Sequence, residues 1–214
     1  MKFHIITIFP SSFDSYLNTS ILKRAKDNSQ MGVLFYDLAD YSEIRTRRVD
    51  DKPFGGLPGA IISPLPLSKA IEDIQSKYGK LDIYYLSPRG KILKQQHLEK
   101  FAKGAKDCIL ICGHYEGIDE RIIDIYKVKE VSIGEYVLTS GELAAMVLID
   151  GITRLINGVI SSESLEEESF SKGINRKKEY PQYTRPREFM GKKVPEELLS
   201  GDPKIIKKWK ESFY

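Results

Sequence analysis

Cysteine is scarce in this chain of 214 residues, and its scarcity excludes two classes of protein. Cys108 and Cys112 are the only two cysteines, too few for a disulfide framework or for a cysteine-based zinc site. They lie four residues apart in one apolar segment, so a strand would point both to the same side of a sheet. Unpaired cysteines are typical of a reducing compartment, and we expect a cytoplasmic protein.

Long hydrophobic runs and nucleotide-binding signatures are also missing. No apolar stretch approaches the ~20 residues of a membrane-spanning helix, and we see no secretory signal, so we expect no membrane association. Residues 49–59 lack the Gly-Lys-Ser/Thr ending of a P-loop, and no G-x-G-x-x-G follows the first apolar segment. These absences argue against a nucleotide triphosphatase and against a dinucleotide-dependent enzyme.

The composition itself indicates a folded protein. Hydrophobic residues make up 41% and charged residues 29% of the chain, which predicts a packed core rather than disorder. The net charge of +3 permits a polyanionic partner without requiring one. Basic residues cluster at 45–48, at 176–178 and near the carboxyl end. Each cluster alone is typical of a solvated face, but the three together favour phosphate contacts.

Strand-like and helix-like segments alternate through residues 1–156. The expected strands are 3–9, 32–38, 81–86, 108–112 and 128–133, and the expected helices are 12–17, 20–26, 65–77, 95–103, 118–126 and 140–155. This alternation predicts an α/β fold with a mostly parallel sheet that is covered on both faces. Residues 40–59 show no helical period, and we expect a long functional loop there.

The pattern changes after residue 156. Residues 157–170 are polar and contain an acidic run, which predicts an interdomain linker. Residues 171–214 predict a small α-helical domain with short helices at 195–199 and 203–212. We therefore expect a large domain at 1–156, the linker at 157–170 and a carboxyl-terminal domain at 171–214.

Two expected strands end in glycine-rich segments. Gly113 follows the strand at 108–112, and Gly134 and Gly141 follow the strand at 128–133. Glycine lets the main chain approach a ligand closely, and main-chain N–H and C=O groups can then recognise a flat heterocycle. The two segments suggest two walls of one pocket.

Several single residues allow two interpretations each. Glu116 lies between an aromatic residue and a glycine and is a better functional candidate than Asp119 and Glu120, whose position suits helix capping. Arg154 could compensate the dipole at the end of a helix, or it could be functional. Glu168 could be part of a hydrated linker, although the Ser-Phe pair that follows it would be unusual there.

Two surface segments also allow both an RNA-contacting and an ordinary structural interpretation. Asp50 and Asp51 could accept hydrogen bonds from a guanine edge beside Arg48, or they could belong to an ordinary loop. The segment 180–186, with Tyr183 and Arg185, could stack on bases and contact phosphates, or it could be a rigid spacer.

Segments 55–59, 112–121, 132–143 and 180–186 together resemble the bacterial tRNA (guanine-N1)-methyltransferase family, TrmD, in the same order and over nearly the whole chain. The resemblance implies the SPOUT class of methyltransferase fold, in which a deep trefoil knot holds S-adenosylmethionine. It also implies an obligate homodimer with an active site shared between protomers. The implied substrate is tRNA, methylated on N1 of the guanine immediately 3′ of the anticodon, position 37.

The resemblance also assigns roles to residues. Glu168 stands where the family has an aspartate and would be the general base, and Arg154 would stabilise the anionic guanine. The implied cofactor-binding residues are Leu86, Ser87, Pro88, Gly113, Tyr115, Glu116, Gly117, Ser132, Ile133, Gly134, Glu135, Tyr136, Val137, Leu138, Gly141 and Ala144. The implied RNA-binding residues are Arg48, Asp50, Asp51, Gly55, Gly59, Tyr183 and Arg185. A magnesium requirement is implied as well, although we identify no set of metal ligands.

Some positions depart from the family pattern and keep two rival functions open. His114 stands where an arginine is usual, and Glu135, Ser140 and Ala144 also differ. An RNA-binding module without catalysis would be consistent with glutamate at 168. The second rival is a methyltransferase of the same fold that acts on a ribose 2′-hydroxyl or on ribosomal RNA. The segments 50–59 and 180–186 argue against it.

Overall fold

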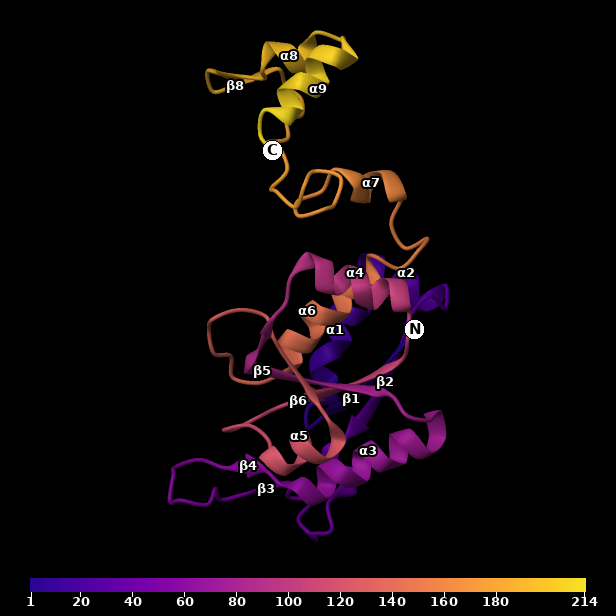
Figure 1. Cartoon of the computed structure of the whole chain (residues 1–214), viewed down its shortest axis with the longest axis vertical. Coiled ribbons are helices and arrows are strands. Elements are labelled where there is room, and N and C mark those ends of the chain that lie inside the picture. Colours follow the sequence, from indigo (N-terminus) through magenta and orange to yellow (C-terminus); the bar gives the residue numbers. More distant parts are fainter. The chain divides into compact units, whose positions relative to one another are not determined.

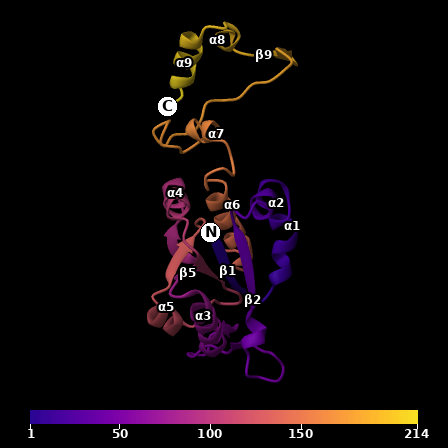
Figure 2. The ribbon, with the colours of Figure 1, turned by 90° about the vertical axis from the view of Figure 1, so that its right-hand side faces the viewer.

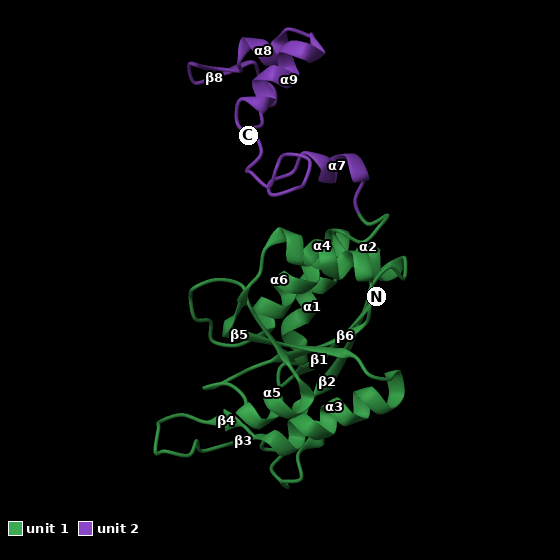
Figure 3. Cartoon of the chain, viewed as in Figure 1, with its two compact units in different colours: residues 1–159 green, residues 160–214 purple.

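The computed structural model describes residues 1–214, which divide into two compact units (Figure 3). The first unit comprises residues 1–159 and the second residues 160–214. Each unit is described by itself.

A five-stranded sheet forms the centre of the first unit, with the strand order β2-β1-β6-β5-β7 and only parallel pairings. The strands are β1 (Lys2–Thr7), β2 (Gly32–Asp37), β5 (Asp82–Ile92), β6 (Cys108–Cys112) and β7 (Lys129–Ser132). All five residues of β6 are buried, as a continuous apolar strand requires when both faces of the sheet are covered. The predicted α/β fold with a mostly parallel sheet is confirmed.

Helices cover both faces of this sheet (Figures 1 and 2). The helical elements of the unit are η1 (Pro10–Phe13), α1 (Asp14–Leu17), α2 (Ser20–Asp27), η2 (Leu38–Tyr41), α3 (Pro64–Tyr78), α4 (Gln95–Gly104), α5 (Glu120–Tyr126) and α6 (Glu142–Thr153). Ile109 and Ile111 of β6 join one core with α3 and α5, whereas Leu110 joins a second core with α2 and α6. This split follows from the alternation of side chains along a strand.

Cys108 and Cys112 both lie in the core on the α6 side, as their spacing predicted. Burial raises the pKa of Cys108 to about 12. Burial, with a smaller contribution from the charge of Glu142, raises the pKa of Cys112 well above its usual value. Both thiols therefore stay protonated at neutral pH and serve as small apolar core residues.

Strand β5 is longer than predicted. Residues 87–90 interrupt its register, and Lys91 and Ile92 then pair again with β7. A Cβ atom at Gly90 would lie 2.4 Å from the main-chain nitrogen of Val131, so only glycine fits this crossing. The strand was predicted to end at residue 86, but Pro88 and Gly90 form an irregularity within it.

The predicted loop at 40–59 is partly structured, which corrects the expectation. Residues at its start form η2, and β3 (Asp50–Asp51) pairs antiparallel with β4 (Ile61–Ile62). Ile62 is fully buried and forms a bridge with Ile118, so the base of this hairpin is docked on the segment before α5. The tip stays exposed, and Phe54 has 98% of its surface accessible.

The second unit contains α7 (Ser162–Glu166), β8 (Glu188–Phe189), β9 (Lys192–Lys193), α8 (Glu196–Leu199) and α9 (Pro203–Glu211). The α8 and α9 helices were predicted, whereas α7 and the small β8–β9 hairpin were not. Trp209 of α9 packs edge-on against Tyr180, Tyr183 and Phe213. This aromatic cluster supplies the apolar contacts of a unit that is too small to build a large core.

An ion pair fixes the start of the second unit to its last helix. Lys210 lies 2.6 Å from a carboxylate oxygen of Glu167, and the hydroxyl of Tyr180 donates to the same oxygen at 2.8 Å. These two bonds lower the pKa of Glu167, so the group is anionic at neutral pH. No helix in either unit is long and apolar enough to cross a membrane.

Two isoleucines of α5 provide a matched test of the core. Ile122 is 1% exposed in the core on the α3 side, and Ile125 is 68% exposed. We expect Ile122→Ala to lower the free energy of unfolding by about 2–5 kcal/mol, because it leaves a cavity. We expect Ile125→Ala to change it by about 0.5 kcal/mol or less. Urea unfolding at one protein concentration measures both, and equal effects would contradict the packing described.

Candidate functional site

A pocket of about 220 Å³ opens beside the irregularity in β5 and the ends of β6 and β7. The carboxyl ends of parallel strands are where open α/β sheets bind ligands. The predicted cofactor-binding residues that line it are Leu86, Ser87, Pro88, Gly113, Tyr115, Glu116, Gly117, Ser132, Ile133, Gly134, Tyr136, Val137, Leu138, Gly141 and Ala144. Glu135 is exposed and lies outside the lining. Both glycine-ended segments border this one cavity, as expected.

The two walls touch through their main chains. The N–H of Gly141 donates to the carbonyl of Gly113 at 2.8 Å. A Cβ atom at Gly141 would lie 2.8 Å from the nitrogen of Gly113, and one at Gly113 would lie 2.7 Å from the ring of Tyr85. Glycine is therefore required at 141 for the segment before α6 to cross the end of β6, whereas a side chain at 113 would displace the ring of Tyr85.

The turn after β7 is held by its own side chains. The hydroxyl of Ser132 donates to the carbonyl of Gly134 at 2.9 Å and accepts from its N–H at 3.2 Å. The ring of Tyr136 lies over Gly134, where a Cβ atom would come within 2.2 Å of it. These contacts present a preformed wall of main-chain groups to the cavity.

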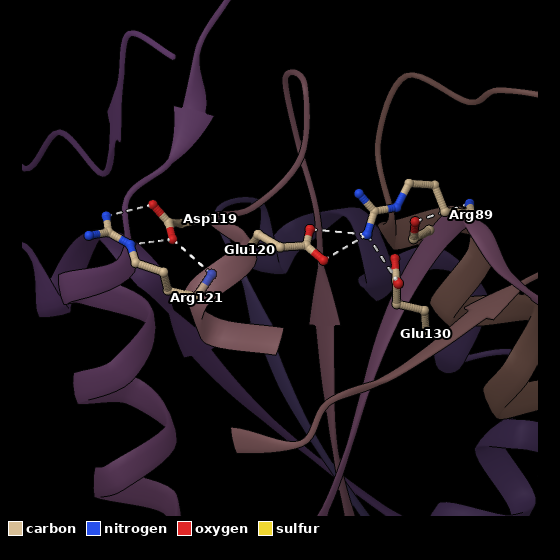
Figure 4. Close-up of polar contacts among 6 residues, drawn as sticks. Arg89, Asp119, Glu120, Arg121 and Glu130 are labelled. Atoms are coloured by element: carbon tan, nitrogen blue, oxygen red, sulfur yellow. Dashed lines mark hydrogen bonds and ion pairs between the residues drawn. The ribbon is translucent and has the colours of Figure 1, made fainter. Parts of the chain in front are cut away.

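Arg89 fixes the third side, the irregular part of β5 (Figure 4). Its guanidinium donates to both carboxylate oxygens of Glu120 at 3.0 Å and to Glu130 at 3.3 Å. The hydroxyl of Ser87 accepts from the N–H of Arg89 at 3.2 Å. Because the arginine is exposed, these bonds contribute little to stability, and their role is to position residues 87–90.

In the segment between β6 and α5, Asp119 caps the helix, as its sequence position predicted. The carboxylate of Asp119 caps α5 by accepting from the N–H of Arg121 at 3.0 Å. It also accepts from the guanidinium of Arg121 at 2.8 Å (Figure 4). The Arg121 guanidinium, followed by the main-chain bond, lowers the pKa of Asp119 against the effect of burial. Asp119 is thus a capping residue.

Glu116 links the pocket to the 50–62 hairpin. Its N–H donates to the carbonyl of Ala60 at 3.0 Å. Its side chain lies against Gly59, where a Cβ atom would come within 2.7 Å of it, and Gly59 has a positive φ of 93°. The predicted RNA-binding loop and the predicted cofactor-binding residues are therefore neighbours in the first unit.

The structure brings five of the predicted RNA-binding residues together in this hairpin and its approach. Arg48 lies 3.4 Å from the carboxylate of Asp50, and Asp51 accepts from the N–H of Lys52 at 2.7 Å. Gly55, like Gly59, has a positive φ, and no atom lies within 4 Å of the place of its Cβ. Tyr183 and Arg185 belong to the second unit, where Arg185 is exposed and Tyr183 is half-exposed against Trp209.

The two predicted catalytic residues belong to different units. Arg154 follows the last residue of α6, and its N–H donates to the carbonyl of Asp150 at 3.0 Å. Glu168 lies in the second unit, and its carbonyl accepts from the N–H of Ser171 at 3.0 Å. Both side chains are partly buried.

The chain around Glu168 is ordered by hydrogen bonds. The N–H of Phe170 donates to the carbonyl of Lys177 at 2.7 Å, and the hydroxyl of Ser171 donates to the carbonyl of Glu166 at 2.6 Å. Ile174 is fully buried beneath this loop. A main chain bonded in this way can hold a carboxylate in one orientation, which a free linker does not do.

Tyr85, Val131 and Thr139 also line the pocket although the sequence did not single them out, and so do His114 and Ser140, which were noted only as departures from the family pattern. The His114 ring packs edge-on against Tyr115 at 4.6 Å and Phe9 at 5.3 Å, and its Nδ1 atom is buried without a hydrogen-bond partner. Its place directly after Gly113 was the available signal. No group of three or more His, Cys, Asp or Glu side chains is arranged to hold a metal ion.

Comparison with known proteins gives a consistent result. The family model described as tRNA (Guanine-1)-methyltransferase TrmD matches residues 1–213. A tRNA (guanine-N(1)-)-methyltransferase of Clostridioides difficile is 47% identical over 213 residues, covering 98% of this chain and 90% of that protein. The corresponding protein of Caldanaerobacter subterraneus is 48% identical over 211 residues, covering 98% and 85%.

A solved structure extends the likeness to three dimensions. The tRNA (m1G37) methyltransferase from Aquifex aeolicus superposes with a TM-score of 0.81 at 36% sequence identity, covering 99% of this chain and 88% of that one. Family match, sequence identity and fold agree over essentially the full length, and the chain therefore belongs to the TrmD family of tRNA (guanine-1)-methyltransferases.

Proposed function

We propose that the protein transfers a methyl group from S-adenosylmethionine to N1 of the guanine immediately 3′ of the anticodon, position 37 of tRNA. The observation that carries this proposal is the pocket beside the irregularity in β5 and the carboxyl ends of β6 and β7, walled by main chain that crosses at Gly113 and Gly141. Family membership supports the substrate and the reaction. We place the protein in the cytoplasm, and magnesium remains an expectation from the family.

The pocket residues fit S-adenosylmethionine. Main-chain groups around Gly113, Gly134 and Gly141 can recognise the flat adenine, and apolar side chains such as Leu86 and Leu138 can pack on it. No lysine or arginine lines the cavity, and Glu116 is its only acid. The lining thus avoids repelling a positively charged sulfonium group. The cofactor supplies an electrophilic methyl group when it is bound.

The chemistry assigns separate tasks to the two predicted catalytic residues. Guanine N1 carries a proton, so a base must remove it before the nitrogen can accept a methyl group. We assign that role to the carboxylate of Glu168. Negative charge then develops on guanine O6, and the guanidinium of Arg154 is suited to stabilise it. Holding the base and the methyl donor in line supplies much of the remaining acceleration.

A shared active site in a homodimer is the arrangement that we propose. One protomer would supply the pocket and Arg154, and its twin would supply Glu168 through residues 157–170 and the domain at 171–214. The crossing at Gly113 and Gly141 supports a trefoil knot in each protomer. The 50–59 loop, with Arg48, Asp50 and Asp51, and the segment with Tyr183 and Arg185 would contact the RNA. The guanine must leave its stack to reach the methyl donor.

Glu168→Gln tests catalysis directly. With radiolabelled S-adenosylmethionine and an unmodified tRNA that has guanines at positions 36 and 37, we expect kcat to fall by about 100-fold or more, because general-base catalysis is lost. The dissociation constant of S-adenosylmethionine should stay within about twofold of wild type. Glu168→Asp should retain much of the activity, and Glu163→Gln, an exposed acid of α7, should retain all of it.

Mass spectrometry of the digested RNA identifies the methylated atom and position. Methylation by Glu168→Gln at the wild-type rate would show that Glu168 is not the base. A product on ribose or at another nucleotide would show that the substrate assignment is wrong, and no product from wild type would favour a binding module.

Gly141→Ala tests the pocket. The added methyl group would lie 2.8 Å from the Gly113 nitrogen, so the crossing must open. We expect loss of S-adenosylmethionine binding by isothermal titration calorimetry, at least about tenfold in the dissociation constant. Gly104→Ala is the control, since no atom lies within 4 Å of the place of its Cβ. Thermal unfolding of both variants shows whether the fold survives, and unchanged binding by a folded Gly141→Ala would contradict the proposed cofactor site.

Mixing two inactive variants tests the shared site. A mixed dimer of Glu168→Gln and Gly141→Ala chains would have one site with an intact pocket and an intact Glu168. Random pairing makes half of the dimers mixed, each with one of two sites intact, so co-expression should restore about a quarter of wild-type activity. If each chain uses its own Glu168, co-expression restores nothing. Two copies of the same variant provide the baseline.

A further inference from the structure

A second cavity lies in the first unit, apart from the pocket described above. It measures about 470 Å³, within the range of about 300–1,000 Å³ that is typical of small-molecule sites. It is bordered by α4, by both ends of β5 and by the starts of β6 and β7, whereas the first pocket lies at the middle of β5 and at the ends of β6 and β7. Val131 is the only residue that lines both cavities.

The floor of this second cavity is aromatic and apolar. The rings of Tyr84 and Phe101 meet edge to face with their centroids 4.9 Å apart. Leu93 and Val131 line the cavity beside them, and all four side chains belong to the core on the α6 side. A surface of this kind buries the flat or aliphatic body of a ligand.

The acids at the rim already have partners. Asp82 forms an ion pair of 2.9 Å with Lys129, which also lies over the Tyr84 ring. Asp107 accepts from the N–H of Lys2 at 2.6 Å. The carboxylate of Glu130 binds Arg89 on the side of the first pocket. The lining thus holds four lysines (Lys91, Lys100, Lys106 and Lys129) against three carboxylates (Asp82, Asp107 and Glu130), an excess of one positive charge.

Three further lysines, Lys91, Lys100 and Lys106, line the cavity, and all three are exposed. They come from the end of β5, from α4 and from the turn before β6. His97 lies among them, and burial, followed by the charges of Lys91 and Lys100, lowers its pKa. The cavity therefore combines an apolar floor with a rim whose net charge is positive, and Lys91, Lys100 and Lys106 are the lysines without an ion pair to Asp82.

We propose that this cavity binds an amphipathic small-molecule anion. The apolar body of the ligand lies on Tyr84 and Phe101, and its carboxylate or sulfonate group faces Lys91, Lys100 and Lys106. Charge complementarity and the apolar floor together favour this ligand class. An RNA backbone would contact the lysines but would leave the apolar floor uncovered. The floor therefore favours a small amphipathic anion over RNA as the ligand. The proposal is independent of the methyl-transfer function.

The test uses 8-anilinonaphthalene-1-sulfonate, an aromatic sulfonate whose fluorescence rises in apolar surroundings, with the full-length protein. We expect saturable binding at one site per chain that survives saturating S-adenosylmethionine. The double variant Lys100→Gln/Lys106→Gln should weaken binding by at least about fivefold, because the anion loses two cations. Lys103→Gln, on α4 but outside the cavity lining, should change it less than twofold. These substitutions are at exposed lysines and preserve the core.

The neutral analogue N-phenyl-1-naphthylamine separates charge from apolar contact. Wild type should bind it more weakly than the sulfonate, and the double variant should bind both alike. Displacement of the sulfonate by S-adenosylmethionine, or equal effects of the double variant and Lys103→Gln, would overturn the proposal. A double variant with unchanged sulfonate binding but a weaker salt dependence of tRNA binding would instead identify an RNA-contacting face, and the small-molecule site would then be wrong.

Discussion

The main-chain crossing between Gly113 and Gly141 is the contact on which the site depends. The segment before α6 approaches the main chain at the end of β6 so closely that residue 141 cannot carry a side chain. The same crossing begins α6, whose residues Ala145, Leu148 and Ile152 are fully buried against the sheet. Helix α6 has 12 residues and is roughly 18 Å long. Because the crossing fixes where this helix begins, it sets the pocket wall and also the position of Arg154, which follows the helix.

The residue after Gly141, Glu142, is a buried acid that links the start of α6 to β1. Glu142 is 3% exposed in the first turn of α6, where the helix dipole favours a negative charge. The hydroxyl of Thr7, at the end of β1, donates to it at 2.6 Å. The same hydroxyl accepts from the N–H of Phe9 at 3.0 Å. The end of β1, the start of α6 and the end of β6 are thus joined within a few ångströms around the pocket.

The sequence predicted the elements that have strong periodicity and missed those that depend on tertiary contacts. The buried strand at 108–112 and the helix at 140–155 were visible because apolar residues recur with one period. The continuation of β5 past Gly90 was not, since a glycine that permits a crossing looks the same as one that ends a strand. The β3–β4 hairpin was missed for a similar reason, because two-residue strands have no period and this pair is stabilised by docking on Ile118.

The site shows the same division. Glycine-ended strands predicted a pocket with two walls, and most of its lining was read from the resemblance to known methyltransferases. Tyr85 and Val131 were missed because they read as core residues, and only the packing shows that they also border a cavity. The cavity under α4 gave no signal at all. Its lysines come from three separate segments, and their common rim exists only after the sheet has formed.

The hairpin at 50–62 is attached beside the pocket by main-chain bonds, from Ile62 to Gly117 and from Glu116 to Ala60, and by the buried side chain of Ile62 at its base. Such bonds do not depend on which side chains the tip carries. Residues such as Phe54 and Leu57 can therefore be exchanged during evolution without dislodging the hairpin. The tip can therefore change its chemistry while its attachment beside the pocket stays the same, which separates an adaptable surface from a fixed support within a few residues.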